Sequence, residues 1–158
     1  MVGAEREQLN GFLDFLRATE VGKAAGLSDE QARQPLVASE LTAVAPLLSH
    51  LRYVEHYWFA VVFDGQEDPW AERLKVDRNA EFRLGLDPPL STLVAEYEAE
   101  CEQSRRIAAA RDLDATATTA RGEPVNLRWV LIHMIEETGR HAGHLDLLRE
   151  SIDGRTGE

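Results

Sequence analysis

The 158-residue sequence contains a single cysteine, Cys101, and only two lysines, Lys23 and Lys75. One cysteine excludes an intrachain disulfide and is typical of a reducing cytoplasm, where we expect this chain to reside. No apolar stretch approaches the roughly 20 residues that span a bilayer, and residues 1–10 lack the apolar segment of a secretory signal. We therefore expect no membrane as a partner.

Positive charge is scarce as well. Lys and Arg total 17 against 28 Asp and Glu, which gives a formal net charge of -11. Affinity for nucleic acids and anionic lipids depends largely on neutralising phosphates, so this balance excludes both as general partners. Hydrophobic residues make up 44% of the chain, which is ordinary for a globular protein, and we expect residues 1–158 to form one domain.

Four segments carry apolar side chains at helical spacing, and Pro, Gly and Asp residues separate them. Ser39 and Asn126 stand where the second and fourth helices would be N-capped, and Pro46 is expected to bend the second helix slightly. The polar stretch 66–87 predicts a long crossover with one short helix over 70–74. The predicted long helices cover residues 5–25, 40–63, 87–111 and 126–152.

Each predicted helix has one apolar face. On the first helix this face consists of Leu9, Phe12, Leu13, Leu16, Glu20 and Lys23, and on the fourth it repeats every four and three residues, as in a heptad seam. Such faces predict an all-α fold, a four-helix bundle, although spacing alone leaves the helix directions open. The seam of the fourth helix consists of Leu127, Leu131, Met134, Thr138, His141, Leu145, Leu148 and Ile152.

The histidines are confined to the second and fourth predicted helices. His50 lies on the apolar face of the second helix, and Glu137 and His141 lie one turn apart on the fourth. Helical bundles build metal sites from side chains that project inward from facing helices. Two histidines and one carboxylate bind zinc with one position open, and they also suit Fe(II), Ni or Mn, so these three residues are candidate metal ligands.

A second interpretation of Glu137 stays open on spacing alone. Burying a carboxylate without a partner is costly, and an arginine would satisfy it as well as a metal. Arg52, Arg128 and Arg140 are the candidates for that pairing.

Further candidates have a functional and a structural interpretation. Glu55 is either a rim residue or a buried partner of a histidine or arginine, and Trp58 belongs either to the core or to a pocket wall. Cys101, on the apolar face of the third helix, is interpreted as an inert core thiol.

The run from Arg128 to Glu150, RWVLIHMIEETGRHAGHLDLLRE, together with residues 48–59, resembles the DinB-like (damage-inducible) superfamily, with the nearest likeness to an actinobacterial branch. The resemblance implies an up-up-down-down bundle with a long crossover between helices two and three. It also implies one divalent metal, zinc or nickel, held here by His50, Glu137 and His141. The residues expected beside the ligands or in a neighbouring pocket are His133, His144, Glu55, Arg140 and Trp58.

Many members carry His where this chain has Glu137, and its His, Glu, His set is similar to that of the mycothiol-dependent maleylpyruvate isomerases. The resemblance implies a divalent-metal-dependent enzyme, forming a homodimer, that activates a low-molecular-weight thiol such as mycothiol and transfers it onto a small electrophile. The reacting group is then expected to be a metal-bound thiol or water. A non-enzymatic, stress-related bundle that binds metal or ligand and a metal-dependent hydrolase are the alternatives.

Overall fold

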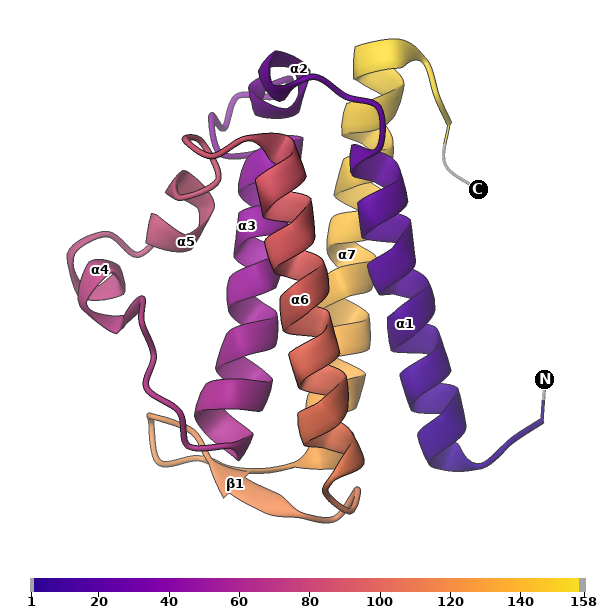
Figure 1. Ribbon diagram of the computed structural model, residues 1–158, viewed down its shortest axis with the longest axis vertical. Coiled ribbons are helices and arrows are strands. Elements are labelled where there is room, and N and C mark those ends of the chain that lie inside the picture. Colours follow the sequence, from indigo (N-terminus) through magenta and orange to yellow (C-terminus); the bar gives the residue numbers. More distant parts are fainter. Residues whose placement is uncertain (1, 157–158) are drawn as a thin grey trace.

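Four long helices carry the buried apolar faces and pack side by side in the computed structural model, which describes residues 2–156 (Figure 1). The fold is all-α apart from one small hairpin, as predicted. In chain order the elements are α1 (Glu5–Ala24), α2 (Asp29–Arg33), α3 (Val44–Glu55), the π-helix η1 (His56–Phe63), α4 (Ala71–Val76), α5 (Ala80–Arg83), α6 (Leu90–Ala109), β1 (Thr116–Thr118), β2 (Pro124–Asn126) and α7 (Leu127–Asp153).

The seam of α7 forms the centre of the core. All its predicted positions are buried except Ile152, which is partly buried and packs against the core. Asn126 caps this helix as predicted, because its side chain accepts a hydrogen bond from the Trp129 N–H, and Gly154 ends it with a φ of 76°. The 3.6-residue periodicity therefore identified the buried face of this helix correctly.

Ion pairs and hydrogen bonds at the helix ends establish the directions of the four helices. Arg128 at the start of α7 pairs with Glu5 at the start of α1, so these two helices run parallel. Arg111, just after α6, pairs with Asp64, just after η1, so α3 and α6 also run parallel. Arg6, near the start of α1, donates to the carbonyl of Arg111, just after the end of α6. The parallel helices α1 and α7 therefore run antiparallel to the parallel helices α3 and α6.

The directions in chain order are therefore up, down, down, up (Figure 1), rather than the expected up-up-down-down. The long crossover does lie between the second and third long helices, because parallel neighbours need a connection that returns along the whole bundle. It contains two short helices, α4 and α5, instead of the one predicted over 70–74. Helical periodicity carries no information on direction, so the sequence could not resolve this point.

The second long helix begins later than predicted, ends at Phe63 as predicted, and changes its winding on the way. It begins at Val44 with Ala43 as the N-cap, whereas Ser39 accepts a backbone hydrogen bond from Thr42 in a preceding turn. Pro46 is thus the third residue of α3, where its missing N–H would have no helical acceptor and no bend is needed. After Glu55 the helix widens into η1, a π-helix of 8 residues.

The Ala- and Thr-rich segment predicted as a loop before the last helix contains a short antiparallel hairpin. Thr116 pairs with Asn126, Ala117 with Val125 and Thr118 with Pro124. Three-residue strands are too short to show an alternating pattern, so they could not be predicted from the sequence.

The end of the crossover is fastened to the start of α3. The Ser49 hydroxyl donates to the backbone carbonyl of Glu81 at 2.6 Å. At Gly85, a Cβ atom would lie 2.5 Å from the carbonyl oxygen of Ala45, so only glycine allows this approach. These contacts hold α5 against the face of α3 that carries His50.

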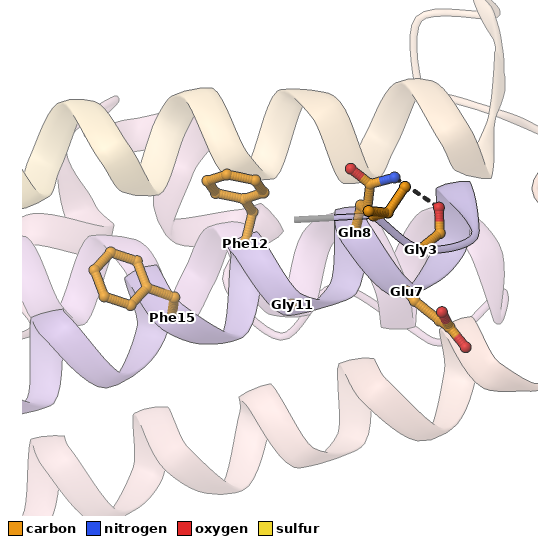
Figure 2. Close-up of a pocket in the computed structure, with 7 residues that line it drawn as sticks. Gly3, Glu7, Gln8, Gly11, Phe12 and Phe15 are labelled. Atoms are coloured by element: carbon orange, nitrogen blue, oxygen red, sulfur yellow. Dashed lines mark hydrogen bonds between the residues drawn. The ribbon is translucent and has the colours of Figure 1, made fainter.

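Phe12 lies outside the core, contrary to the prediction that placed it on the buried face of the first helix. Its side chain and that of Phe15 are 54% and 62% exposed, and Figure 2 shows both rings on one side of α1. They line a surface pocket of about 570 Å³. The reason is geometric: the buried positions of α1 are Leu13, Arg17, Glu20 and Ala24, and two of these are charged.

None of the helices within residues 2–156 combines the length and the apolar character that crossing a bilayer requires.

Buried charges lie between α1 and the other helices. Arg17 donates to both carboxylate oxygens of Glu55, at 2.7 and 2.6 Å, and removing either partner would cost about 3–5 kcal/mol. Glu20 is fully buried, and neither of its oxygens has a hydrogen-bond partner within the described residues. Burial, and secondly the charge of Asp146, raise the pKa of Glu20 to about 8, although Lys23 opposes the shift.

This environment predicts a pH-dependent stability that Glu20→Gln abolishes. Between pH 4.5 and about 8 the folded carboxyl is protonated while the unfolded one is ionised, so the free energy of unfolding falls as the pH rises. As the pH rises from about 5.5 to about 7.5, we expect the free energy of unfolding of the variant, measured by urea denaturation, to increase by roughly 2 kcal/mol relative to that of the wild type. A difference that stays constant with pH would show that Glu20 is ionised in the core.

Candidate metal centre

Three polar side chains from two helices meet inside the bundle. His50 projects from α3, while Glu137 and His141 project from successive turns of α7. The Oε1 atom of Glu137 lies 3.1 Å from Nε2 of His50 and 3.3 Å from Nε2 of His141. All three side chains are largely buried, with exposed fractions of 13, 13 and 10%. The residues selected from the sequence are therefore brought together.

This group fits a divalent cation. One ligand atom from each residue lies within 4.8 Å of the others. Two ligands at about 2.0–2.1 Å from a tetrahedral zinc ion are roughly 3.3 Å apart, which matches the spacing between Glu137 and each histidine. Hydrogen bonds from His141 and His50 hold the pKa of Glu137 well below its usual range, so the carboxylate is available as a ligand at neutral pH.

His50 is oriented by residues of the crossover. Its ring stacks on Phe82, with centroids 4.2 Å apart and planes 6° from parallel. Its Nδ1 atom lies 3.6 Å from Oε1 of Glu81, and an approach of roughly 0.5 Å would make this contact a hydrogen bond. Burial disfavours the charged imidazole, but the carboxylates of Glu137 and Glu81 outweigh it and raise the pKa of His50. With Nδ1 directed at Glu81, Nε2 faces Glu137.

Glu81 is a residue that sequence reasoning missed. Its distance from His50 depends on how the crossover packs on α3, and no local pattern encodes this. The apolar Phe82 next to Glu81 was a hint that part of this segment is packed.

His141 has its own partner on α7. The Nδ1 atoms of His141 and His144 are 3.3 Å apart, so one shared proton can link the two rings and leave Nε2 of His141 directed at Glu137. Burial, followed by the charges of His141 and Arg140, lowers the pKa of His144 and favours its neutral form. His144 is thus adjacent to one candidate ligand.

The arginines considered as partners of Glu137 lie elsewhere or contact it only weakly. Arg52 pairs with Glu96, and Arg128 pairs with Glu5. The exposed Arg140 pairs mainly with Glu136, and its Nη1 lies 3.7 Å from Oε2 of Glu137.

Two further predicted residues lie apart from this group. Glu55 is buried and hydrogen-bonded to Arg17 in the interior, which confirms the interpretation of this residue as a buried partner. Cys101 is buried in α6, and burial, followed by the charge of Glu55, raises the pKa of its thiol, which keeps it protonated.

Trp58 and His133 line a pocket that Glu137 also lines. The pocket has a volume of about 480 Å³ and lies between η1, the hairpin and the first turns of α7. The ring centroids of Trp58 and His133 are 5.1 Å apart, in an edge-to-face arrangement. Both residues therefore belong to the cavity beside the candidate metal ligands.

An all-α bundle with a His, Glu, His group in its interior defines a class of helical proteins with a candidate metal site. Within this class, the sequence profile of the mycothiol-S-transferase family matches residues 8–154. The chain belongs to this family. The profile spans all three candidate ligands and the hairpin. No curated protein matches the sequence.

Solved structures with the same fold include a mycothiol-dependent maleylpyruvate isomerase, at a TM-score of 0.66 and 16% identity, covering 88% of this chain. A mutant of a mycothiol-dependent maleylpyruvate isomerase matches with a TM-score of 0.67 and 15% identity over the same share. The chain spans 60% of the length of each of these structures. At this identity the likeness establishes the fold.

The position of Glu81 predicts that Glu81→Gln weakens binding of a divalent metal. Carboxylates that orient a ligating histidine typically contribute about 10–100-fold in affinity, and we expect a loss within this range. Zinc competition against a chromophoric chelator measures it. Glu136→Gln, which removes the same charge from the outer face of α7, is the matched control and should bind zinc as the wild type does. Equal affinities of the Glu81 variant and the wild type would show that Glu81 does not orient His50.

Proposed function

We propose that this chain is a divalent-metal-dependent enzyme that transfers a low-molecular-weight thiol of the mycothiol type onto a small electrophile. The observation that carries the proposal is the convergence of His50, Glu137 and His141, of which Glu137 also lines a pocket, in a chain that belongs to the mycothiol-S-transferase family. Zinc or nickel suits two imidazoles and one carboxylate.

The residues of the chain have separable tasks in this proposal. His50 and His141 supply imidazole nitrogens, and Glu137 supplies one negative charge, so a site holding a divalent cation keeps a net positive charge that favours an anionic sulfur. A divalent cation lowers the pKa of a coordinated thiol and thereby supplies thiolate at neutral pH. In this proposal Glu81 and His144, which lie beside the Nδ1 atoms of His50 and His141, orient the two rings.

In this proposal the electrophile binds in the pocket that Glu137 lines, next to this group. Cys101 has no task in the proposal, because it is buried in α6 and its thiol stays protonated. A reducing cytoplasm, where the single cysteine predicts the chain to reside, keeps the thiol substrate reduced.

The ligand assignment predicts that His50→Ala and His141→Ala each lose the metal while the bundle stays folded. Metal analysis of purified proteins should find about one ion per wild-type chain and background amounts in both variants, since three protein ligands hold the ion. His56→Ala is the matched control, because His56 lies on the same helical segment but pairs with Glu100. Full occupancy in either ligand variant would overturn the assignment.

The proposed reaction predicts that metal-loaded protein consumes mycothiol in the presence of an aryl chloride electrophile, with chloride as the leaving group. We expect His50→Ala to lose this activity and Cys101→Ser to keep it, and a free-thiol assay measures both. Turnover that persists without thiol would indicate a hydrolase instead. Stoichiometric metal binding without turnover, over a range of electrophiles, would indicate a non-enzymatic binding protein.

The homodimer implied by the resemblance predicts a self-association surface, and the exposed pair Phe12 and Phe15 is where we expect it (Figure 2). Phe15→Glu would place a charge in that contact. Light scattering should give the mass of a dimer for the wild type and of a monomer for the variant. A wild-type mass of one chain would exclude the dimer.

A further inference from the structure

The pocket beside the candidate metal ligands contains features that the binding of a metal and a thiol does not require. It is lined by aromatic side chains along its length, and a charged hairpin turn forms its rim. Its volume of about 480 Å³ lies within the roughly 300–1,000 Å³ range of small-molecule sites. The inference below rests on the proposed function, since it assigns the electrophile of that reaction to this pocket.

The wall of the pocket is an aromatic cluster. Trp129 and His133 stack with centroids 5.1 Å apart and planes 12° from parallel, and the Trp58 ring meets both edge-to-face. Tyr57, one residue before Trp58, also lines the cavity. The indole of Trp129 is 47% exposed, so part of this aromatic surface is uncovered. Such a wall favours a flat, conjugated ligand that stacks on it.

The π-helix contributes to this wall. η1 covers His56–Phe63, and Tyr57 and Trp58 lie in its first turn. Because a π-helix has wider turns than an α-helix, the side chains after His56 are rotated from the directions that an α-helix would give them. Short π segments are frequent at functional sites in proteins. Here the widening coincides with the residues that line the pocket.

The rim of the pocket is a structured turn. The Gly122 N–H donates to the carbonyl of Thr119 at 2.9 Å, and Gly122 has a φ of 81°. Thr119 is buried, and its backbone N–H donates to the carbonyl of Glu123. The turn therefore presents Arg121 and Glu123 at the mouth of the cavity, and neither side chain forms an ion pair with any residue in the range 2–156.

We propose that the electrophile is a planar aromatic or conjugated molecule that carries a carboxylate. Its ring packs against the uncovered surface of Trp129, its anionic group binds Arg121 at the rim, and its reactive end points toward Glu137. Arg121 then selects for anionic substrates, whereas Glu123, on the same turn, weakens that selection.

The test compares two probes that differ only in charge, 2-naphthoate and 2-naphthylmethanol. Both are titrated into metal-free, chelator-treated protein labelled with ¹⁵N, so that the carboxylate cannot bind a metal. NMR shifts of the amides of residues 119–123 and of the indole N–H groups report the location. Because neither thiol nor metal is present, the result can be interpreted whether or not the protein proves to be a transferase.

We expect the acid to bind roughly two- to five-fold more tightly than the alcohol, the size of effect that a solvent-exposed ion pair gives. Arg121→Gln should abolish this preference and Glu123→Gln should increase it. Arg155→Gln, beyond the far end of α7, is the matched control and should leave the preference unchanged. Trp129→Ala should lower the affinity for both probes by a similar factor.

Equal binding of acid and alcohol to the wild type, or a preference that survives Arg121→Gln, would overturn the assignment of the anionic group. Unchanged affinities in the Trp129→Ala protein, or shifts confined to residues outside the pocket, would overturn the stacking site. Circular dichroism of each variant confirms that it is folded before titration.

Discussion

The carboxylate of Glu137, held between two imidazoles, is the interaction on which the centre of this molecule depends. It joins α7 to α3 at a depth where an unpaired charge would be strongly destabilising. His50 brings the crossover into the same contact through Phe82 and Glu81. Three segments that are far apart in the sequence therefore converge on one carboxylate, and a divalent cation would satisfy the same groups that now bond to one another.

The second buried polar centre, around Arg17 and Glu55, has a different character. A bidentate ion pair there satisfies both charges without a ligand, while Glu20 one turn further along α1 has no hydrogen-bond partner within the described residues. The bundle thus contains two separate buried polar groups. The Arg17–Glu55 ion pair needs no ligand, whereas the group on α3 and α7 suits a metal. Glu137 of the second group lines a pocket together with Trp58, Trp129 and His133, whereas Arg17 lines a smaller cavity of about 260 Å³.

The sequence predicted what depends on periodicity. The seam of α7, the face of α3 that carries His50, and the one-turn spacing of Glu137 and His141 all follow from 3.6 residues per turn. Features that depend on packing between distant segments were not predictable. The helix directions, the contact of Glu81 with His50 and the hairpin at the pocket rim are of this kind. Phe12 was misplaced because the buried face of α1 is centred on Leu13, Arg17, Glu20 and Ala24; the predicted stripe included Glu20 but not Arg17, whose charge its pattern does not place inside.

Gly85 shows how far the influence of a residue can extend beyond its own contacts. It touches no candidate ligand, yet it alone allows the crossover to lie against the first turn of α3. Any side chain at this position would lift the segment that carries Glu81 and Phe82 away from His50. In a genetic screen for lost metal binding, changes at Gly85 would therefore be recovered beside changes in the ligands themselves, although the residue has no chemistry to offer.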